Sequence, residues 1–427
     1  MNSALPIDPT SAAKLAERGL RFDLVDTSDL AVFRPWLDAD SRGFHAAPFS
    51  DETAEQFMAG TADRRTSGVW DDSGADAKTP VATVNSWATP LTVPGERQID
   101  AWAISSVTVA STHRRRGIAR ELLESELRSA AQQKLALAML TVSESTIYGR
   151  FGFSPAALSA DYEIDTRKAR FTGVAPSGRV QFVPLEQVRD EAPAIIEANR
   201  LRTPGDIATW SHLWDRTFAI SSDDKEFAKR IRAIRYDDAS GTPQGFALYT
   251  LKEHEHDFSK HTARVHSLVT ATDDAYAGLF AFLLELDLTT KLVLPLRSVD
   301  EPIRWQVADF RAIRATDVRD HLWVRILDVP AALAARDYFA ALDLVIEVTD
   351  ELGFAAGRYR LGDSIERTDD EPDVTLSVNE LGSIYLGGIS ALTLERAGRI
   401  VGHTEGAVEL LDAAFRSPVT PSLSVWF

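Results

Sequence analysis

Three consecutive arginines and a glycine stand where an expected strand gives way to an expected helix. Val107 and Val109 alternate as in a strand, and the pattern Arg114-x-x-Gly117-x-Ala119 then leads into a segment whose apolar residues recur at helical spacing. The first turn of a helix has unpaired backbone N–H groups and a partial positive charge, so it attracts anions. Glycine and alanine let backbone approach such a ligand closely. The tract predicts a phosphate site, the alternative being an ordinary basic helix start on a solvated surface.

A tyrosine follows the next expected strand, which covers residues 135–142. Tyr148 stands in the run Ile147-Tyr148-Gly149-Arg150-Phe151-Gly152. A tyrosine hydroxyl has an ordinary pKa of about 10, so at neutral pH it holds a proton that a leaving group can take. The alternative is a packed aromatic ring with a satisfied hydroxyl.

Together these two runs resemble a known family. Arg114-x-x-Gly117-x-Ala119 matches the pyrophosphate-binding pattern of the GNAT N-acetyltransferases, and the runs Thr112–Gly117 and Ile147–Gly152 resemble those of the Eis (enhanced intracellular survival) proteins of actinobacteria. The resemblance implies that acetyl-CoA wedges between two strands that splay apart. It implies Tyr148 as the general acid and the backbone amide of Val109 as an oxyanion donor. The implied coenzyme-binding residues are Val107, Val109, Arg114, Arg115, Gly117, Ile118, Ala119 and Ser143.

The last residue is the second catalytic candidate. The chain ends in Trp426-Phe427, although chain ends are generally polar. The Eis resemblance implies that the free carboxylate of Phe427 reaches the active site and acts as the general base. The alternative is an apolar tail that merely docks on the surface.

Acidic and aromatic residues gather early in the chain, on what the resemblance implies is the acceptor side. Such a mixture suits a cationic amine, although most residues of this kind are simply solvated surface. We name Trp36, Asp38 and Phe44 as the substrate-binding candidates. The other members of this group are Asp40, Phe49, Asp51 and Glu52.

Composition excludes several classes of protein. The net charge of −17 over 427 residues argues against nucleic acid and fits a cationic partner. No apolar run is long enough to span a membrane and no signal peptide is visible, which predicts a cytoplasmic protein without a membrane partner. The absence of cysteine excludes a thiol nucleophile. His254 and His256 have a spacing compatible with a metal, but a solvated hairpin tip explains them better, so we expect no metal.

The predicted fold class is α+β, with tandem GNAT-like domains of mixed β-sheet flanked by helices and then a sterol-carrier-protein-like α+β domain. We place a catalytic GNAT domain at 1–165 and a second GNAT-like domain at 172–309. The second lacks a coenzyme site because the acidic connection at 270–275 would repel a pyrophosphate. The last domain, at 310–427, supplies the terminal carboxylate and is expected to begin with a helix from Ala312 to Leu322.

The resemblance implies an acetyl-CoA-dependent N-acetyltransferase, without a metal, that acetylates amines of aminoglycosides, at several positions, and lysine side chains. Attack is direct, in a ternary complex. It also implies a homohexamer. Two alternatives remain open: a GNAT enzyme for another polyamine, and a non-catalytic lipid or hydrophobe carrier with a relic GNAT domain.

Overall fold

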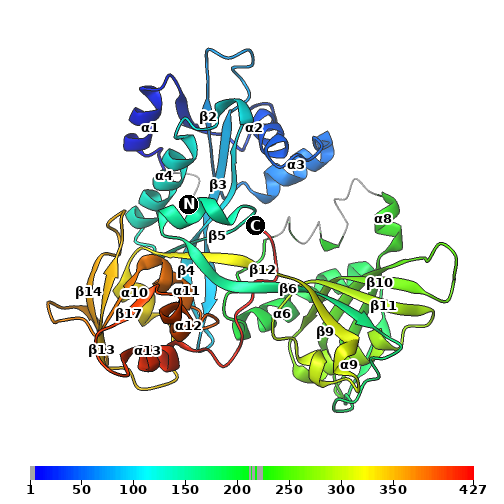
Figure 1. Ribbon diagram of the computed structural model, residues 1–427. Helices are drawn as coiled ribbons and strands as arrows, with labels where there is room; N and C mark the ends of the chain where they lie inside the picture. Colours follow the sequence, from blue (N-terminus) through cyan, green and yellow to red (C-terminus); the bar gives the residue numbers. More distant parts are fainter. Residues whose placement is uncertain (1–4, 211–212, 214–216, 219–224) are drawn as a thin grey trace.

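Two β-sheets organise the protein. The computed structural model describes residues 5–210, 213, 217–218 and 225–427. Within these residues the strands form a 12-stranded sheet, in the order β1-β2-β3-β4-β5-β12-β6-β11-β10-β9-β8-β7, and a five-stranded sheet, in the order β15-β14-β13-β16-β17. Figure 1 shows three lobes joined by the long strands β6 and β12. Mixed sheets flanked by helices confirm the predicted α+β class.

The first lobe holds the predicted phosphate tract. Its strands are β1 (Arg21–Leu24), β2 (Arg65–Trp70), β3 (Ala82–Val93), β4 (Arg97–Val109) and β5 (Leu137–Thr141), and its helices are α1 (Pro9–Ala16), α2 (Leu30–Gly43), α3 (Asp51–Gly60) and α4 (Ile118–Gln132). The short 3-10 helix η2 (Ser111–His113) precedes α4. Helix α4 buries the apolar stripe Leu122, Leu123 and Leu127 in the core of this lobe.

Strands β4 and β5 diverge after a short parallel pairing. They pair only from Ala101 opposite Leu137 to Ala103 opposite Met139, and β4 then continues to Val109 paired with β3 but not with β5. On its other edge, the register of β4 with β3 shifts opposite Val84, and Ser106 has a φ of 55°. A bulge of this kind bends the strand away from its neighbour. The result is the splayed pair that the resemblance implies.

The second lobe also contains a strand that leads into a helix, but the start of this helix is acidic instead of basic. After α5 (Ser145–Tyr148), η3 (Gly149–Phe151) and β6 (Ser154–Asp165) come β7 (Arg179–Phe182), α6 (Leu185–Arg202), α8 (Lys225–Arg230), β8 (Arg232–Asp237), β9 (Pro243–Lys252), β10 (His261–Thr270), α9 (Asp273–Leu284) and β11 (Thr289–Arg297). The first turn of α9 carries Asp273 and Asp274, and its N-cap is Thr272. His254 and His256 lie exposed in the loop between β9 and β10.

The helix predicted from Ala312 to Leu322 is wrong. Residues Ile313–Ile326 form strand β12, which lies between β5 and β6 and is antiparallel to both. Leu322 and Val324 pack in one core while Trp323 packs in another, because successive side chains of a strand point to opposite faces. The first half of β12 is largely exposed and charged, which hid this alternation from the sequence.

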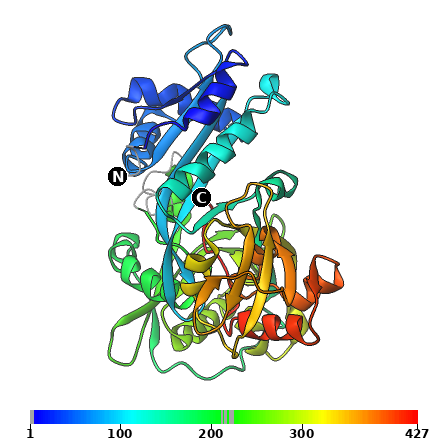
Figure 2. The ribbon, with the colours of Figure 1, turned by 90° about the vertical axis from the view of Figure 1, so that its left-hand side faces the viewer.

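The third lobe is the last part of the chain, and its tail runs back to the first lobe. It contains α10 (Val329–Ala334), β13 (Leu344–Thr349), β14 (Gly357–Leu361), β15 (Ile365–Arg367), β16 (Val374–Ser377), α11 (Val378–Ile384), α12 (Ala391–Arg396), β17 (Ile400–Gly402) and α13 (Ala407–Phe415). The tail after α13 then runs back toward the base of the first lobe, where both views place the C-terminus (Figures 1 and 2). In the part of the chain that the structure describes, no helix is long and apolar enough to cross a membrane.

Candidate active site

Two cavities meet between the splayed strands. The larger has a volume of about 950 Å³ and opens along η2 and the start of α4. The smaller, of about 450 Å³, lies between β4, β5, α2 and the C-terminal tail. They share four lining residues, which are Phe44, Val107, Ser143 and Tyr148. A molecule in one cavity can therefore reach a molecule in the other beside Tyr148.

All eight predicted coenzyme-binding residues line the larger cavity. They are Val107, Val109, Arg114, Arg115, Gly117, Ile118, Ala119 and Ser143.

The three arginines of the tract differ in their partners. Arg116 lies 3.5 Å from the carboxylate of Asp71, and its Nη2 donates to the carbonyl oxygen of Arg18 (3.1 Å). The Arg18 side chain in turn donates to the carbonyl oxygen of Arg116 (3.0 Å). Hydrogen bonds, first from Ser73 and then from His113, hold the pKa of Asp71 below its ordinary value, so it stays an anion. Arg114 and Arg115 are exposed and have no ion-pair partner among the described residues. The sequence could not separate these roles, but the structure leaves two guanidinium groups available to phosphate.

Gly117 makes the turn between this loop and α4. It has a φ of 75°, in the left-handed region that glycine adopts at little cost, and it is the N-cap of α4. The unpaired N–H groups at the start of α4 then face the larger cavity, which Ile118 and Ala119 line. Arginine side chains and a helix N-terminus together fit a pyrophosphate.

Tyr148 is held at the junction by the third lobe. Asn379, at the start of α11, donates hydrogen bonds to the carbonyl oxygens of Gly149 (2.9 Å) and Phe153 (2.8 Å), which flank the turn after Tyr148. The Tyr148 ring is 7% exposed and packs edge-on against Phe153. Burial and, next, the Glu144 carboxylate raise the pKa of Tyr148 above its ordinary value of 10. Its hydroxyl therefore stays protonated at neutral pH.

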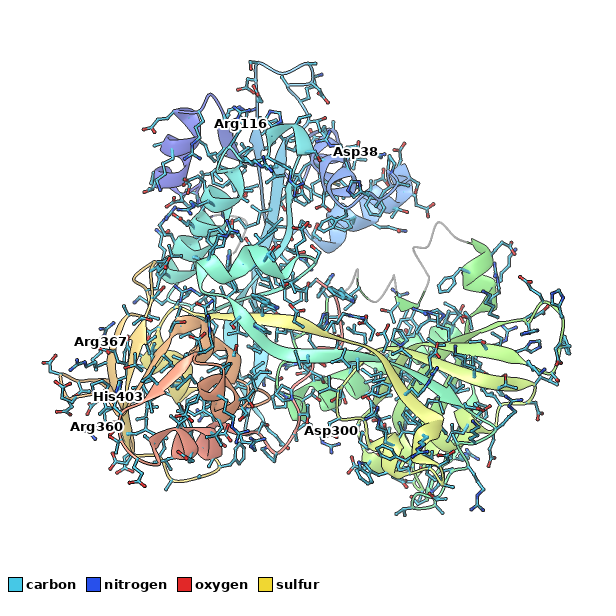
Figure 3. The ribbon with its side chains drawn as sticks, viewed as in Figure 1. Asp38, Arg116, Asp300, Arg360, Arg367 and His403 are labelled. Carbon is cyan, nitrogen blue, oxygen red and sulfur yellow. The ribbon has the colours of Figure 1, made fainter. Side chains whose placement is uncertain are left out.

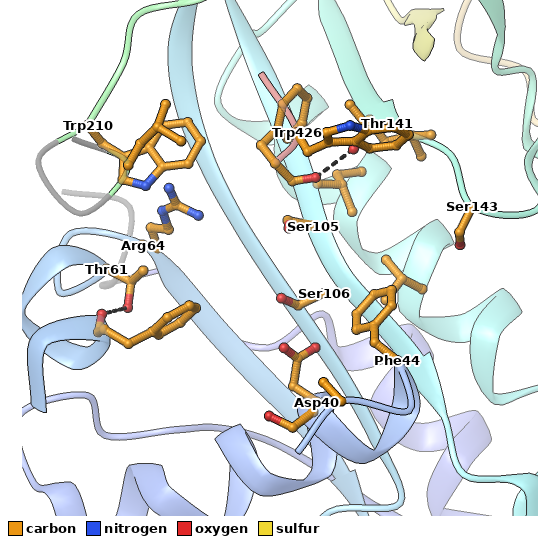
Figure 4. A pocket seen from close by; sticks show the side chains of 18 of the residues that line it. Asp40, Phe44, Thr61, Arg64, Ser105, Ser106, Thr141, Ser143, Trp210 and Trp426 are labelled. Carbon is orange, nitrogen blue, oxygen red and sulfur yellow. Dashed lines mark hydrogen bonds between the residues drawn. The ribbon is translucent and has the colours of Figure 1, made fainter. Parts of the chain in front are cut away.

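The chain terminus reaches the smaller cavity. Thr141, at the end of β5, donates a hydrogen bond of 2.6 Å to the terminal carbonyl oxygen of Phe427, and the Phe427 ring packs edge-on against Trp87. Figure 4 shows this hydrogen bond beside the Trp426 side chain. Phe427 is thus held on the same splayed strands that form the cavity.

Two buried polar groups hold the tail before it enters the cavity. Asp206 accepts hydrogen bonds from the backbone and the hydroxyl of Ser424, and burial raises the pKa of Asp206 to about 6. His321 on β12 donates from Nε2 to the carbonyl oxygen of Val425 (2.9 Å), and its ring packs against Trp426. Burial lowers the pKa of His321 to about 4, so the ring is neutral. Asp206 and His321 are far from the tail in the sequence, so no local pattern predicts these contacts.

The three substrate-binding candidates lie in different environments. Phe44 lines both cavities. Trp36 does not line either one, because its ring packs in the core under α2 and donates to the Ser67 carbonyl oxygen. Asp38 is also outside both cavities: it pairs with Arg34 on the same helix at 3.0 Å, and Figure 3 shows it on α2. The lining of the two cavities therefore does not support Trp36 and Asp38 as substrate-binding residues, and that role stays a prediction.

Asp40 is the carboxylate of α2 that does line the smaller cavity. It is 9% exposed, and its Oδ1 has no hydrogen-bond partner among the described residues. Burial raises the pKa of Asp40 to about 7, and a hydrogen bond with Ser106 acts in the opposite direction. Spacing along α2 does not single out Asp40, because Trp36 and Phe44 both stand four residues from it and Trp36 packs in the core.

Comparison with known proteins agrees with this geometry. Residues 27–156 and 205–326 each match an acetyltransferase (GNAT) domain, and residues 329–424 match a sterol carrier protein domain. The chain is 35% identical over 400 residues to an uncharacterized N-acetyltransferase of Streptomyces coelicolor, covering 91% of this chain and 95% of that one. It is 35% identical over 340 residues to the N-acetyltransferase Eis of Mycobacterium tuberculosis, covering 77% and 81%.

The chain belongs to the Eis family of GNAT N-acetyltransferases. The crystal structure of Eis1 from Mycobacterium abscessus superposes with a TM-score of 0.81 at 29% identity, over 95% of this chain and all of that one. The protein is therefore an N-acetyltransferase of the Eis type, whose co-substrates are acetyl-CoA and an amine. Its larger cavity carries donors of the kind that a pyrophosphate needs.

Proposed function

We propose that this Eis-family enzyme transfers the acetyl group directly from acetyl-CoA, bound in the larger cavity, to an amine bound in the smaller one. The observation that carries the proposal is the junction of the two cavities at Tyr148, with the terminal carboxylate of Phe427 in the smaller cavity. Both reactants can then be held together, and such positioning removes much of the entropic cost of a bimolecular reaction.

In the proposed reaction each proton has a stated origin and destination. An amine attacks a thioester only when neutral, and the Phe427 carboxylate takes the proton that the amine must lose. The C–N bond forms as the C–S bond breaks, and Tyr148 gives its proton to the departing sulfur. The backbone amide of Val109 is the proposed donor to the charge that develops on the carbonyl oxygen. Arg114, Arg115 and the start of α4 hold the pyrophosphate.

The remaining assignments are proposals from the family resemblance. We propose residues 1–165 as the catalytic GNAT domain, 172–309 as a GNAT-like domain without a coenzyme site, and 310–427 as the sterol-carrier-like domain. The acidic start of α9 supports the absence of a second coenzyme site. Aminoglycoside amines and lysine side chains are the first acceptors to test, with other polyamines as the alternative. The homohexamer and the cytoplasmic location stay predictions.

Release of CoA thiol from acetyl-CoA tests the proposal. Wild-type protein with its native C-terminus is mixed with acetyl-CoA, with and without kanamycin, tobramycin, a lysine peptide or an amine that also carries a carboxylate. We expect thiol release that depends on the acceptor, together with an acceptor whose mass rises by one acetyl group. Release that does not depend on any amine would contradict direct transfer.

A further inference from the structure

Arg64 lines the smaller cavity and is the feature that transfer to a simple amine does not explain. It follows α3 and is only 6% exposed. Its guanidinium carbon lies 3.5 Å from the ring centroid of Trp87 and 4.5 Å from that of Trp210. Stacking of this kind fixes the plane of a guanidinium group. Arg64 is therefore a positioned cation, not a side chain that can turn to solvent.

Among the described residues no carboxylate is hydrogen-bonded to the Arg64 guanidinium group, and the exposed Asp63 acts on it only through its charge. Its Nη1 donates to the side-chain oxygen of Asn85 at 3.3 Å, and its Nη2 has no hydrogen-bond partner among the described residues. The next residue behaves differently, because Arg65 makes a buried ion pair of 2.6 Å with Glu126. Burial lowers the pKa of Arg64 to about 9, which still leaves it charged at neutral pH. An unpaired buried charge is costly, so Arg64 is poised for an anion that arrives from outside.

A carboxylate with a free oxygen enters the same cavity from another side. Figure 4 shows Asp40 beside Ser106 and Arg64 beside Trp210, separated by the open space of the cavity. The two groups form no ion pair with each other among the interactions of the described residues, and Asp40 Oδ1 and Arg64 Nη2 are both without partners there. One wall thus offers a site for a cation and another a site for an anion.

We propose that the acceptor is an amine that also carries a carboxylate, which Arg64 binds while the amine lies toward Asp40 and the chain terminus. This inference rests on the proposed acetyl transfer and specifies its substrate class. A guanidinium group binds a carboxylate through charge-assisted hydrogen bonds, which are stronger than neutral ones. An acceptor that is only cationic would satisfy Asp40 and leave Arg64 facing a like charge.

Matched acceptors test the proposal on the wild-type enzyme. We would compare 4-aminobutyrate and 6-aminohexanoate with their carboxamides, which keep the amine and the length but lose the negative charge. The better carboxylate should exceed its carboxamide in kcat/KM by about tenfold or more, the range of a charged hydrogen bond. Equal kcat/KM values for both pairs would overturn the proposal.

Two variants show whether Arg64 causes the preference. Arg64→Gln should bring the carboxylate-to-carboxamide ratio close to one, whereas Arg64→Lys should retain part of it. Glu55→Gln is the control, because Glu55 is an exposed carboxylate on the preceding helix α3 and does not line the cavity. If Arg64→Gln lowers kcat/KM for both members of a pair equally, Arg64 is structural and the proposal is wrong.

Equilibrium binding separates this inference from the proposed transfer. Trp210 and Trp426 line the cavity, so tryptophan fluorescence can follow the binding of each acceptor without turnover. Tighter binding of the carboxylate, lost in Arg64→Gln, without thiol release would support the anion site and contradict acetyl transfer. Thiol release with both members of a pair, and no difference in binding, would support transfer and contradict the anion site.

Discussion

Asp40 should make the stability of the protein fall as the pH rises. Burial raises its pKa from 3.8 to about 7. A carboxyl group with a raised pKa in the folded state contributes stability that is fully present below the unfolded-state pKa, and this contribution is lost as the pH rises through the folded-state pKa. The window for Asp40 therefore runs from about pH 4 to about pH 7, and the loss is complete above it.

The size of the effect follows from the shift in pKa. Raising a pKa from 3.8 to about 7 corresponds to about 4 kcal/mol of unfolding free energy over the whole window. Between about pH 5 and about pH 8 the loss is about 3 kcal/mol, since part of the titration lies below pH 5. Asp40→Asn removes this ionisation. Relative to wild type, the variant should therefore gain about 3 kcal/mol in unfolding free energy as the pH rises across this range.

The assay is urea unfolding of wild type and Asp40→Asn at both pH values, with the difference between the proteins as the measured quantity. Asp38→Asn is the matched control on the same helix, because Asp38 is 40% exposed in its surface pair with Arg34. Surface ion pairs of this kind contribute about 0–1 kcal/mol to stability, so we expect Asp38→Asn to change the unfolding free energy little. A difference between Asp40→Asn and wild type that does not change with pH would refute the reasoning about burial.

Two further predictions concern the larger cavity and the junction. Tyr148→Phe removes the proposed proton donor, so turnover should fall about 100-fold or more with little change in acetyl-CoA affinity; unchanged turnover in steady-state kinetics would remove Tyr148 from the acid role. Arg114→Gln should weaken acetyl-CoA binding about tenfold, measured by calorimetry, because Arg114 has no ion-pair partner among the described residues. Arg116→Gln, its control, should mainly lower the melting temperature, since Arg116 pairs with Asp71. Equal losses of affinity in the two variants would show that the structure does not separate their roles.

The order of residues along the chain was enough to predict which residues line the larger cavity. The phosphate tract lies within one strand, one turn and one helix, so spacing along the chain fixes which residues meet. Gly117 and the arginines line one cavity because they are neighbours in sequence. Tyr148 could be placed beside this cavity for the same reason, because it closely follows the second splayed strand.

The acceptor side depends on contacts between distant residues, which spacing does not reveal. Asp40 lines the cavity and Asp38 does not because of the rotation of α2 against the sheet. Arg64 lies against Trp210, almost 150 residues later, and Phe427 is held by Thr141 from β5. The first half of strand β12 was predicted as a helix because its charged, exposed residues hide its pairing with β6.

We propose that the terminal carboxylate of Phe427 acts on the acceptor at the junction of the two cavities. The most direct measurement compares thiol release by the protein ending at Phe427 with release by the same protein extended by two glycines. The extension moves the free carboxylate away from Thr141, so the acceptor-dependent rate should fall about 100-fold or more. Acetyl-CoA affinity and melting temperature should stay close to wild type, which would show that the site is intact. Full activity in the extended protein would exclude the terminal carboxylate of Phe427 as the general base.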